Sequence, residues 1–327
     1  MTDVKPPVVQ VLLKPDWAKG NLVDDVRRGL GAHPRTLPPK WLYDDRGSAL
    51  FDQITHLPEY YPTNCEREIL EEHALDIALE SGATTLIELG SGTSEKTRQL
   101  LNAFRSTGQL ERFAPVDVSE GILRAAADNI SHEYPGLQVE AIVGDFTLHL
   151  GDLPKGGPRM VAFLGGTIGN LYSEERVAFL GALADSLELG DSLLLGTDLV
   201  KDAARIIDAY NDDSGLTADF VLNSLRVLNR ELGADFNPDS FSYVPFWDAH
   251  MERMDLRVRA EMPQHVRIPG ADLEFDLASG EEIRIEISSK FRIEELRSEL
   301  ADAGFEVKQF YTDPEANFGL TLATRSD

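Results

Sequence analysis

The sequence predicts an α/β protein built on a doubly wound, mostly parallel sheet of the Rossmann type. Three observations predict this fold. Short apolar segments alternate with amphipathic ones between residues 84 and 197, a Gly-x-Gly turn follows the first apolar segment, and the later apolar segments also end in polar residues. Apolar strands that alternate with helices are typical of a parallel sheet covered on both faces. A glycine turn after the first strand leaves backbone open to a ligand.

The first part of the chain is expected to hold less regular structure. We expect a helix at about 22–30, after which several prolines break the chain. The stretch 41–63 is rich in aromatic residues and leads to the next helix, which we expect at about 64–81. Tyr60 and Tyr61 are bracketed by two prolines, so we expect them on a rigid turn rather than in a helix.

The alternating region then supplies the sheet and its covering helices. We expect strands at 84–89, 112–117, 139–143, 160–164 and 192–197. We expect the helices between them at 95–107, 120–134 and 173–186. Each expected strand is short and apolar, as strands buried in a parallel sheet are.

The alternation stops after residue 197, which indicates an inserted domain. We expect helices at 201–210 and 215–232, then antiparallel strands at 241–247, 253–261, 264–268 and 283–288. A helix at 293–303 and strands at 305–312 and 318–323 return to the α/β pattern and close the sheet. The expected domains are 1–199 with 290–327, and an inserted α+β substrate-binding domain at 200–289. Within the first domain we expect an N-terminal helical and aromatic lid at 1–65, a cofactor-binding core at 66–199 and closing elements at 290–327.

The composition argues against several classes of function. The chain of 327 residues has a net charge of −25, and binding to nucleic acid or anionic lipid needs a basic face. Its seven histidines and single cysteine, Cys65, show no metal-ligand spacing, so we expect no metal. One cysteine points to a reducing compartment, and the apolar run at 8–13 is too short for a signal peptide or membrane span. We therefore expect a cytoplasmic protein. We also expect a monomer, although the sequence does not settle the oligomeric state, because no coiled-coil pattern is present and surface patches do not show in a sequence.

The first two expected strands end in residues suited to a nucleoside. In an open α/β sheet, ligands bind beyond the carboxyl ends of the strands. The first strand gives Glu88 and the turn Gly90, Ser91 and Gly92, where the missing side chains allow close approach of a ligand. The second ends at Asp117, where a carboxylate can accept both hydrogen bonds of a ribose diol.

The next two strand ends complete the pattern. Asp145 and Phe146 follow the third strand and suit an adenine, because the acid accepts from the exocyclic amine and the ring offers an apolar face. The fourth strand leads into a glycine-rich loop that holds Gly165 and Asn170. Each residue could also serve an ordinary structural role, since Asp117 could cap a helix, Phe146 could be core and Asn170 could cap a turn. Their coincidence at four successive strand ends favours a nucleoside site.

The first turn suits a cation better than a diphosphate. A dinucleotide fingerprint has a third glycine where this chain has Glu95, and an acid at a helix start repels a pyrophosphate. Glu88 adds further negative charge. S-adenosylmethionine carries a sulfonium, so this methyl donor is favoured, and NAD remains the weaker alternative.

Several longer motifs resemble those of a known family. They are Lys40-Trp41-Leu42-Tyr43-Asp44, Leu57-Pro58-Glu59-Tyr60-Tyr61-Pro62-Thr63, Glu88-Leu89-Gly90-Ser91-Gly92-Thr93-Ser94-Glu95-Lys96-Thr97, Thr167-Ile168-Gly169-Asn170, Leu194-Leu195-Gly196-Thr197-Asp198-Leu199-Val200-Lys201-Asp202 and Lys290-Phe291. With them, nearly the whole chain is similar to the S-adenosylmethionine-dependent L-histidine Nα-methyltransferases of ergothioneine biosynthesis. The segment around Tyr60 is far more specific than the glycine turn.

The resemblance implies a class I methyltransferase core and three successive methyl transfers to the α-amine of L-histidine, which give hercynine. It implies S-adenosylmethionine as the donor and S-adenosylhomocysteine as the product. For the substrate, it implies that Asn170 and Tyr60 bind the carboxylate and amino end, Tyr43 lies near the amine, Glu286 and Ser288 hold the imidazole, and Tyr210 lines the same pocket. Tyr43 and Asn170 are the expected catalytic residues. The residues expected to bind the cofactor are Glu88, Gly90, Ser91, Gly92, Lys96, Asp117, Asp145, Phe146 and Gly165.

The residues are also compatible with different roles. Tyr43 and Tyr60 could be core aromatics, and Glu286 could be an exposed strand acid. The chain could methylate another amino acid or a small amine, because Leu256 stands where the family commonly has methionine. It could also be a nucleoside-binding sensor that contacts a partner protein through the insertion.

Overall fold

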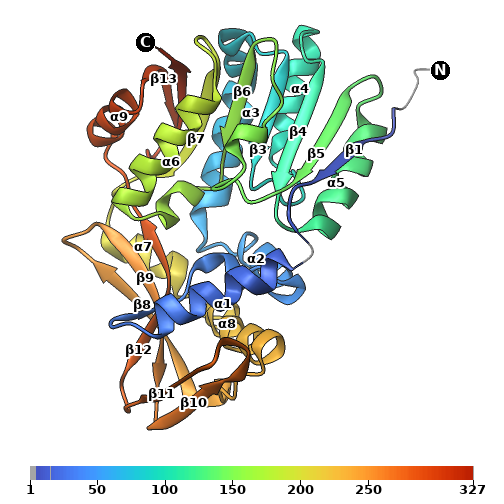
Figure 1. Ribbon diagram of the computed structural model, residues 1–327. Helices are drawn as coiled ribbons and strands as arrows, with labels where there is room; N and C mark the ends of the chain where they lie inside the picture. The colour runs from blue at the N-terminus through green and yellow to red at the C-terminus, as the bar shows by residue number, and fades with distance from the viewer. Residues whose placement is uncertain (1–4, 15, 327) are drawn as a thin grey trace. The chain divides into compact units, whose positions relative to one another are not determined.

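The computed structural model describes residues 5–14 and 16–326, and the chain divides into two compact units (Figure 1). The core unit comprises Met1–Lys14, Asn64–Leu199 and Phe291–Asp327. The insertion unit comprises Pro15–Thr63 and Val200–Lys290. The lid expected at 1–65, whose residues 1–4 and 15 lie outside the described part, is therefore divided: residues 5–14 and 64–65 belong to the core unit, whereas residues 16–63 fold with the inserted segment.

The core unit is built on the expected doubly wound sheet, which is confirmed. Its strand order is β1-β5-β4-β3-β6-β7-β14-β13, parallel from β1 to β7, and β14 and β13 close it as an antiparallel hairpin. The strands are β1 (Val8–Val11), β3 (Thr85–Leu89), β4 (Arg112–Asp117), β5 (Gln138–Val143), β6 (Arg159–Phe163), β7 (Ser192–Asp198), β13 (Phe305–Thr312) and β14 (Phe318–Arg325). Strand β1 was not expected from the sequence; it adds to the edge of the sheet beside β5.

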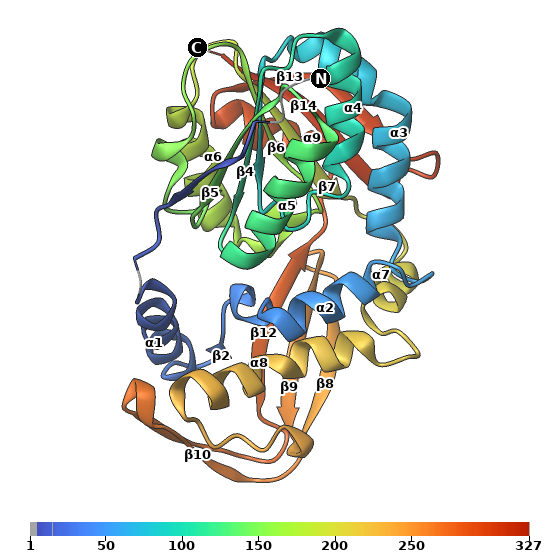
Figure 2. The same cartoon turned by 90° about the vertical axis from the view of Figure 1, so that its right-hand side faces the viewer.

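Helices cover both faces of this sheet. Figure 2 shows α6 on one side and α3, α4 and α5 on the other. The helices are α3 (Tyr61–Ser81), α4 (Thr97–Thr107), α5 (Glu120–Glu133), α6 (Ser173–Ser186) and α9 (Ile293–Asp302), with 3₁₀ turns η2 (Leu150–Asp152) and η3 (Thr167–Asn170). All five helices were expected, within a few residues at their ends.

One turn prediction was wrong. Tyr61 is the first residue of α3 rather than part of a rigid turn with Tyr60. Proline is compatible with the first turn of a helix, because the backbone N–H that it lacks has no partner there. Pro62 therefore lies in the first turn of this helix, where a break was expected.

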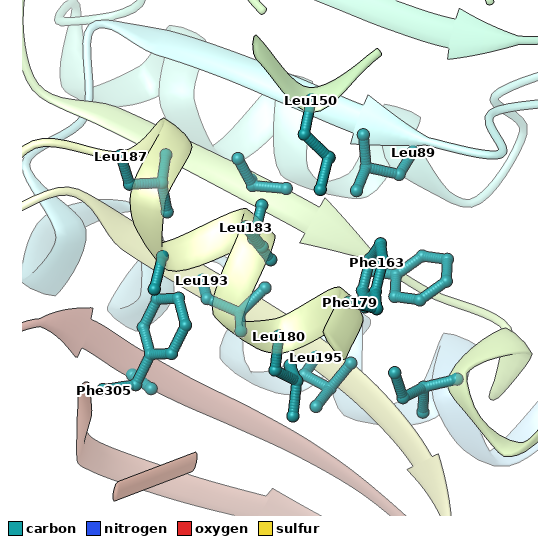
Figure 3. Packing of buried hydrophobic residues seen from close by; sticks show 14 of the residues in the cluster. Leu89, Leu150, Phe163, Phe179, Leu180, Leu183, Leu187, Leu193, Leu195 and Phe305 are labelled. Carbon is teal, nitrogen blue, oxygen red and sulfur yellow. The ribbon is translucent and has the colours of Figure 1, made fainter. Parts of the chain in front are cut away.

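The main core lies between the sheet and helices α6 and α9. Strands β3, β6 and β7 are buried along their whole length. Phe179, Leu183 and Leu187 on α6 and beside it pack in one cluster with strand residues such as Phe163 and with α9, and Figure 3 shows these side chains between the elements. Burial of such side chains is what holds helices to a sheet, at about 1.5–3 kcal/mol for each large one.

The insertion unit has an α+β fold of its own. Its sheet has the order β2-β12-β9-β8, in which β12, β9 and β8 are antiparallel, and a separate hairpin joins β10 to β11. The strands are β2 (Arg35–Thr36), β8 (Phe241–Asp248), β9 (Arg253–Ala260), β10 (Gln264–Ile268), β11 (Leu273–Leu277) and β12 (Glu282–Ser289). The helices are α1 (Trp17–Leu30), α2 (Asp45–Ile54), α7 (Ala203–Tyr210) and α8 (Leu216–Leu232), with 3₁₀ turns η1 (Pro39–Leu42), η4 (Pro238–Ser240) and η5 (Pro269–Ala271). Helix α2 and strands β2 and β11 were not expected.

Specific contacts explain why residues 16–63 belong to this unit. Strand β2 pairs in parallel with β12, and α2 and η1 pack against α8. Asp44, the N-cap of α2, accepts hydrogen bonds from Asn223 Nδ2 and Arg230 on α8, both at 2.7 Å. These partners lie about 180 residues away in the chain. No helix in the part of the chain that the structure describes is both long and apolar enough to cross a membrane.

Candidate active site

The glycine turn after β3 lies against the end of β4. Gly90 N and Ser91 N donate to Val116 O at 2.9 and 3.1 Å. Gly90 and Gly92 have φ values of 66° and 50°, in the left-handed region where a side chain would be strained. A Cβ atom placed on Gly92 would have no described atom within 4 Å. The turn therefore presents bare backbone to open space, as a close-lying ligand requires.

Asp117 ties this turn to the next strand end. Its Oδ2 accepts from Gly92 N at 2.9 Å, and its Oδ1 accepts from Ser119 N at 2.8 Å. Burial raises the pKa of Asp117, against the effect of these backbone hydrogen bonds. Each carboxylate oxygen can accept a second hydrogen bond, so the geometry still allows a diol to bind.

Glu88 is buried beneath the same turn. Thr97 donates a hydrogen bond to its Oε1. Its Oε2, Ser91 Oγ and Ser94 Oγ are buried and have no hydrogen-bond partner among residues 5–14 and 16–326, although the Ser94 hydroxyl lies close enough to Glu88 to lower the pKa of its carboxyl. Buried polar atoms are nearly always satisfied, and Glu88 Oε2 and Ser94 Oγ can satisfy each other, so Ser91 Oγ is the atom that indicates a polar ligand here. A carboxylate there suits a ligand that carries positive charge.

The titration of Glu88 follows from its burial. Burial raises the pKa of Glu88 to about 7, and the negative charge of Asp117 adds to the rise. The hydroxyls of Thr97 and Ser94 and the positive charge of Lys96 act in the opposite direction but do not cancel it. The Glu88 carboxyl at the end of β3 therefore changes its charge near neutral pH.

Asp145 and Phe146 lie at the end of β5. Asp145 is buried, and its Oδ1 accepts from Thr147 N at 2.8 Å and Thr147 Oγ1 at 2.6 Å. Phe146 packs edge-to-face on Phe163 with ring centroids 5.1 Å apart. A Cβ on Gly90 would lie 3.7 Å from the Phe146 ring. Phe146 is thus partly a core residue, and it also lies beside the glycine turn.

A buried acid that was not expected from the sequence joins two of the loops. Glu66 on α3 is 0 % exposed; its Oε1 accepts from Gly165 N at 2.8 Å, and its Oε2 pairs with the Lys96 ammonium. A Cβ on Gly196 would collide with this carboxylate, so only glycine at that place on β7 leaves room for it. Glu66 therefore contacts both the loop after β3 and the loop after β6 and links the two.

Asn170 ends the 3₁₀ turn η3 after β6. Gly165 and Gly166 precede the turn with φ values of 76° and 69°, which only glycine adopts readily. Asn170 does not cap the following helix: the N-cap of α6 is Tyr172, whose backbone N–H donates to Glu175 at 2.9 Å. No hydrogen bond joins the Asn170 amide to any residue that the structure describes, so its donor and acceptor groups are available to a ligand.

The aromatic residues expected at the substrate gather in the insertion unit. Tyr43 packs edge-to-face on Phe51 and Phe220, with ring centroids 5.5 and 5.3 Å apart. Tyr60 packs on Phe51 and on Tyr210, at 6.2 Å in each case. Tyr43, Tyr60 and Tyr210 come from three separate segments and meet in this one cluster.

The polar residues expected at an imidazole lie on β12 of the same unit. Tyr210 Oη and Ser288 Oγ are 2.7 Å apart and hydrogen-bonded, and both residues are buried. Glu286 is two residues before Ser288, on the same face of the strand. Burial raises the pKa of Tyr243 well above its ordinary value, and the neighbouring Glu286 carboxylate adds to the rise. Tyr243 Oη in turn donates to Tyr210 O at 2.8 Å.

Lys290 is the second residue that sequence reasoning missed. It is 5 % exposed, and its ammonium donates to both Tyr210 Oη and Ser288 Oγ. A signal for each missed residue was present. Lys290 continues the alternation of Glu286 and Ser288, and Glu66 falls at the helical spacing of the buried residues Ile69 and Leu70.

The expected site residues thus fall into two groups. The nine residues expected at the cofactor and Asn170 all belong to the core unit, whereas Tyr43, Tyr60, Tyr210, Glu286 and Ser288 belong to the insertion unit. No group of three or more His, Cys, Asp or Glu side chains is arranged to hold a metal in the part of the chain that the structure describes.

Comparison with known proteins finds a matching family model and several similar proteins. A family model described as histidine-specific methyltransferase, SAM-dependent, matches residues 22–325. The histidine N-alpha-methyltransferase of Mycolicibacterium smegmatis is 54% identical over 313 residues, which cover 96% of this chain and 98% of that protein. The histidine N-alpha-methyltransferase of Mycobacterium tuberculosis is 52% identical over 92% of this chain and 94% of that protein. Ergothioneine biosynthesis protein 1 of Neurospora crassa is 36% identical over 61% of this chain, but this region is only 23% of that protein.

The raised pKa of Glu88 predicts a pH-dependent stability. Its folded value of about 7 lies above the ordinary value of 4.5, so its contribution to stability is fully present below pH 4.5 and is lost as pH rises through 7. Glutamine mimics the protonated acid but does not titrate. We expect Glu88→Gln to match the wild type at pH 4.5 and to exceed its unfolding free energy by about 3 kcal/mol at pH 8.5. Urea unfolding at both pH values measures this, with Glu71→Gln, an exposed acid on α3, as the control; equal effects at both pH values would contradict it.

The Glu66–Lys96 ion pair predicts that substitutions of the two residues have non-additive effects on the free energy of unfolding. Lys96→Met leaves the Glu66 carboxylate buried without its cation, whereas Glu66→Gln combined with Lys96→Met removes both charges. We expect the double variant to be more stable than Lys96→Met by about 1–3 kcal/mol, from double-mutant cycles of unfolding free energy. Lys308→Met, which breaks an exposed pair with Glu306, is the control and should change stability by less than about 1 kcal/mol. A double variant less stable than Lys96→Met would contradict this prediction.

Proposed function

This chain belongs to the family of histidine-specific, S-adenosylmethionine-dependent methyltransferases, and from that premise we propose that it methylates the α-amine of L-histidine three times to give hercynine for ergothioneine biosynthesis. The observation that carries the proposal is the extent of the match, because residues 22–325 include both units. The names of the relatives supply the substrate and the pathway.

In this proposal the core unit binds the donor. S-adenosylmethionine supplies a methyl group on a sulfonium, which a neutral amine can take by in-line displacement. Asp117 accepts from the ribose hydroxyls, and Asp145 and Phe146 hold the adenine. Glu88, under the glycine turn, favours the positively charged donor over its neutral-sulfur product when it is ionised.

The remaining core residues position these groups. Gly90, Ser91 and Gly92 offer backbone at close range, and Gly165 does the same in the loop after β6. Lys96 contributes through its pair with Glu66, which holds both loops. The unsatisfied Ser91 Oγ supports the assignment, because the donor carries polar groups that can satisfy it.

The insertion unit recognises the substrate side chain. A neutral imidazole has one N–H donor and one bare nitrogen acceptor, and Glu286 and Ser288 can meet one each. Tyr210 supports Ser288, and Tyr60 and Tyr43 lie in the aromatic cluster that we assign to the amino-acid end. We assign Asn170 to the substrate carboxylate and amine. None of these groups acts as a nucleophile, so the protein accelerates the reaction by orientation and by keeping the amine neutral.

The proposal also covers the setting of the enzyme. We propose a cytoplasmic monomer that binds no metal, nucleic acid or membrane. The net charge of −25 and the single buried cysteine, Cys65, support this setting.

The direct test is the reaction itself. We expect the purified protein to convert L-histidine and S-adenosylmethionine to a product heavier by three methyl groups, all on the α-amine. Mass spectrometry with fragmentation reads both the number and the position of the methyl groups. L-tryptophan and L-tyrosine are the matched substrates, and faster methylation of either than of histidine would show that the substrate assignment is wrong.

The imidazole assignment predicts a selective loss in Glu286→Ala. A hydrogen bond to a charged group contributes about 1.5–3 kcal/mol, so we expect histidine affinity to fall by about 10- to 100-fold. Donor affinity should stay within about twofold, because Glu286 belongs to the insertion unit. Calorimetric titration with each ligand measures the two effects, with Glu274→Ala on the β10–β11 hairpin as the control. Equal losses of both affinities would contradict the role of Glu286.

A further inference from the structure

Lys290 forms a closed hydrogen-bonded triangle with Tyr210 and Ser288. Its Nζ donates to Tyr210 Oη at 2.9 Å and to Ser288 Oγ at 2.8 Å, and the two hydroxyls are 2.7 Å apart. All three residues are buried. The backbone of Lys290 is held as well, because its N–H donates to Glu252 O at 2.8 Å directly after β12. The ammonium is therefore held in place behind Ser288.

The triangle constrains the direction of each hydrogen bond. An ammonium can only donate, so both hydroxyl oxygens must accept from Lys290. The ammonium contacts both oxygens, so intrinsic donor strength decides between them: a phenol is a stronger donor than an aliphatic hydroxyl, and we assign the bond between the hydroxyls from Tyr210 to Ser288. Ser288 Oγ then accepts twice, from Lys290 and from Tyr210. Both of its acceptor positions are filled, and its own hydrogen remains for a ligand.

We propose that Lys290 is a positioning residue that makes Ser288 a hydrogen-bond donor to the substrate ring. The inference rests on the proposed function and extends it to the form of the ring. Beside this donor, the Glu286 carboxylate can only accept. A ring that matches both has one N–H and one bare nitrogen, which is a neutral imidazole in a single tautomer. A ring that lacks the bare nitrogen leaves the Ser288 hydrogen unmatched.

Two analogues isolate this interaction. In 3-(pyrrol-2-yl)-L-alanine and 3-(pyrrol-3-yl)-L-alanine, one or the other ring nitrogen of histidine is replaced by C–H, so each keeps an N–H but has no acceptor. Calorimetric titration of each, with S-adenosylhomocysteine present to prevent turnover, gives its affinity relative to L-histidine. One neutral hydrogen bond should favour histidine over the better analogue by about tenfold in the wild type.

Lys290→Met should abolish this preference. We expect histidine affinity to fall by about tenfold while the affinity for the better analogue changes by less than about twofold. A merely structural role would weaken both ligands equally. Ser288→Ala should lose the same preference, and adding Lys290→Met to it should cause no further loss. Lys40→Met, which removes another lysine of the insertion unit that pairs with Asp25 at 2.9 Å, is the control and should keep the preference.

Each outcome separates this inference from the proposed function. If the wild type binds histidine no better than either analogue and does not methylate it, the proposed function fails. If the wild type prefers and methylates histidine but Lys290→Met keeps the preference, only the role of Lys290 is overturned. If Lys290→Met does not fold, Lys290→Gln replaces it, because it keeps a polar side chain but removes the ammonium, and its amide oxygen can accept the Ser288 hydrogen. Full preference for histidine in Lys290→Gln would then overturn the inference.

Discussion

Parallel pairing of β3 with β4 and β6 determines where the polar groups of the core unit gather. The three strands run in register from Thr85, which lies opposite Arg112 and Arg159, so their carboxyl ends reach the same edge of the sheet. The apolar strands lie in the core, and the polar residues that follow them therefore lie together at this edge of the sheet. Two buried acids, Glu66 and Glu88, lie there, and each needs donors. Thr97 donates to Glu88, and Gly165 N and the Lys96 ammonium donate to Glu66.

The insertion unit reaches a similar result from an antiparallel sheet. Alternation along β12 sends one face into an apolar core and the other toward Tyr210. Glu286, Ser288 and Lys290 follow one another at spacings of two residues, so a carboxylate, a hydroxyl and an ammonium share one face. Buried polar groups of this kind are costly unless they satisfy one another, and this mutual satisfaction fixes their orientation. In the proposed role, selectivity for a ring follows from the direction of these hydrogen bonds.

Much of the architecture was predictable from local patterns. The strands and helices of the doubly wound sheet follow from hydrophobic periodicity, and the closing hairpin was expected as well. The family was predicted from motifs in both units and is confirmed by the match over residues 22–325. Elements with weak periodicity were missed: β1, β2 and β11 have only two to five residues, and α2 lies in a segment that was read as connecting aromatic chain. Pro62 was taken as a break because its place in the first turn of α3 depends on the helix that follows.

The sequence by itself determined which residues end the strands. It therefore also determined which polar groups meet at the sheet edge, because the carboxyl ends of parallel strands all lie at the same edge. It also determined the alternation that places Glu286 and Ser288 on one face. Only the tertiary structure decided that residues 16–63 fold with the inserted segment, since β2 and Asp44 find their partners far along the chain. Only the tertiary structure showed that Glu66 and Lys290 are buried and which groups they contact. A charged residue is ordinarily expected at the surface, and its burial becomes visible only when the distant groups that compensate its charge are brought to it by folding.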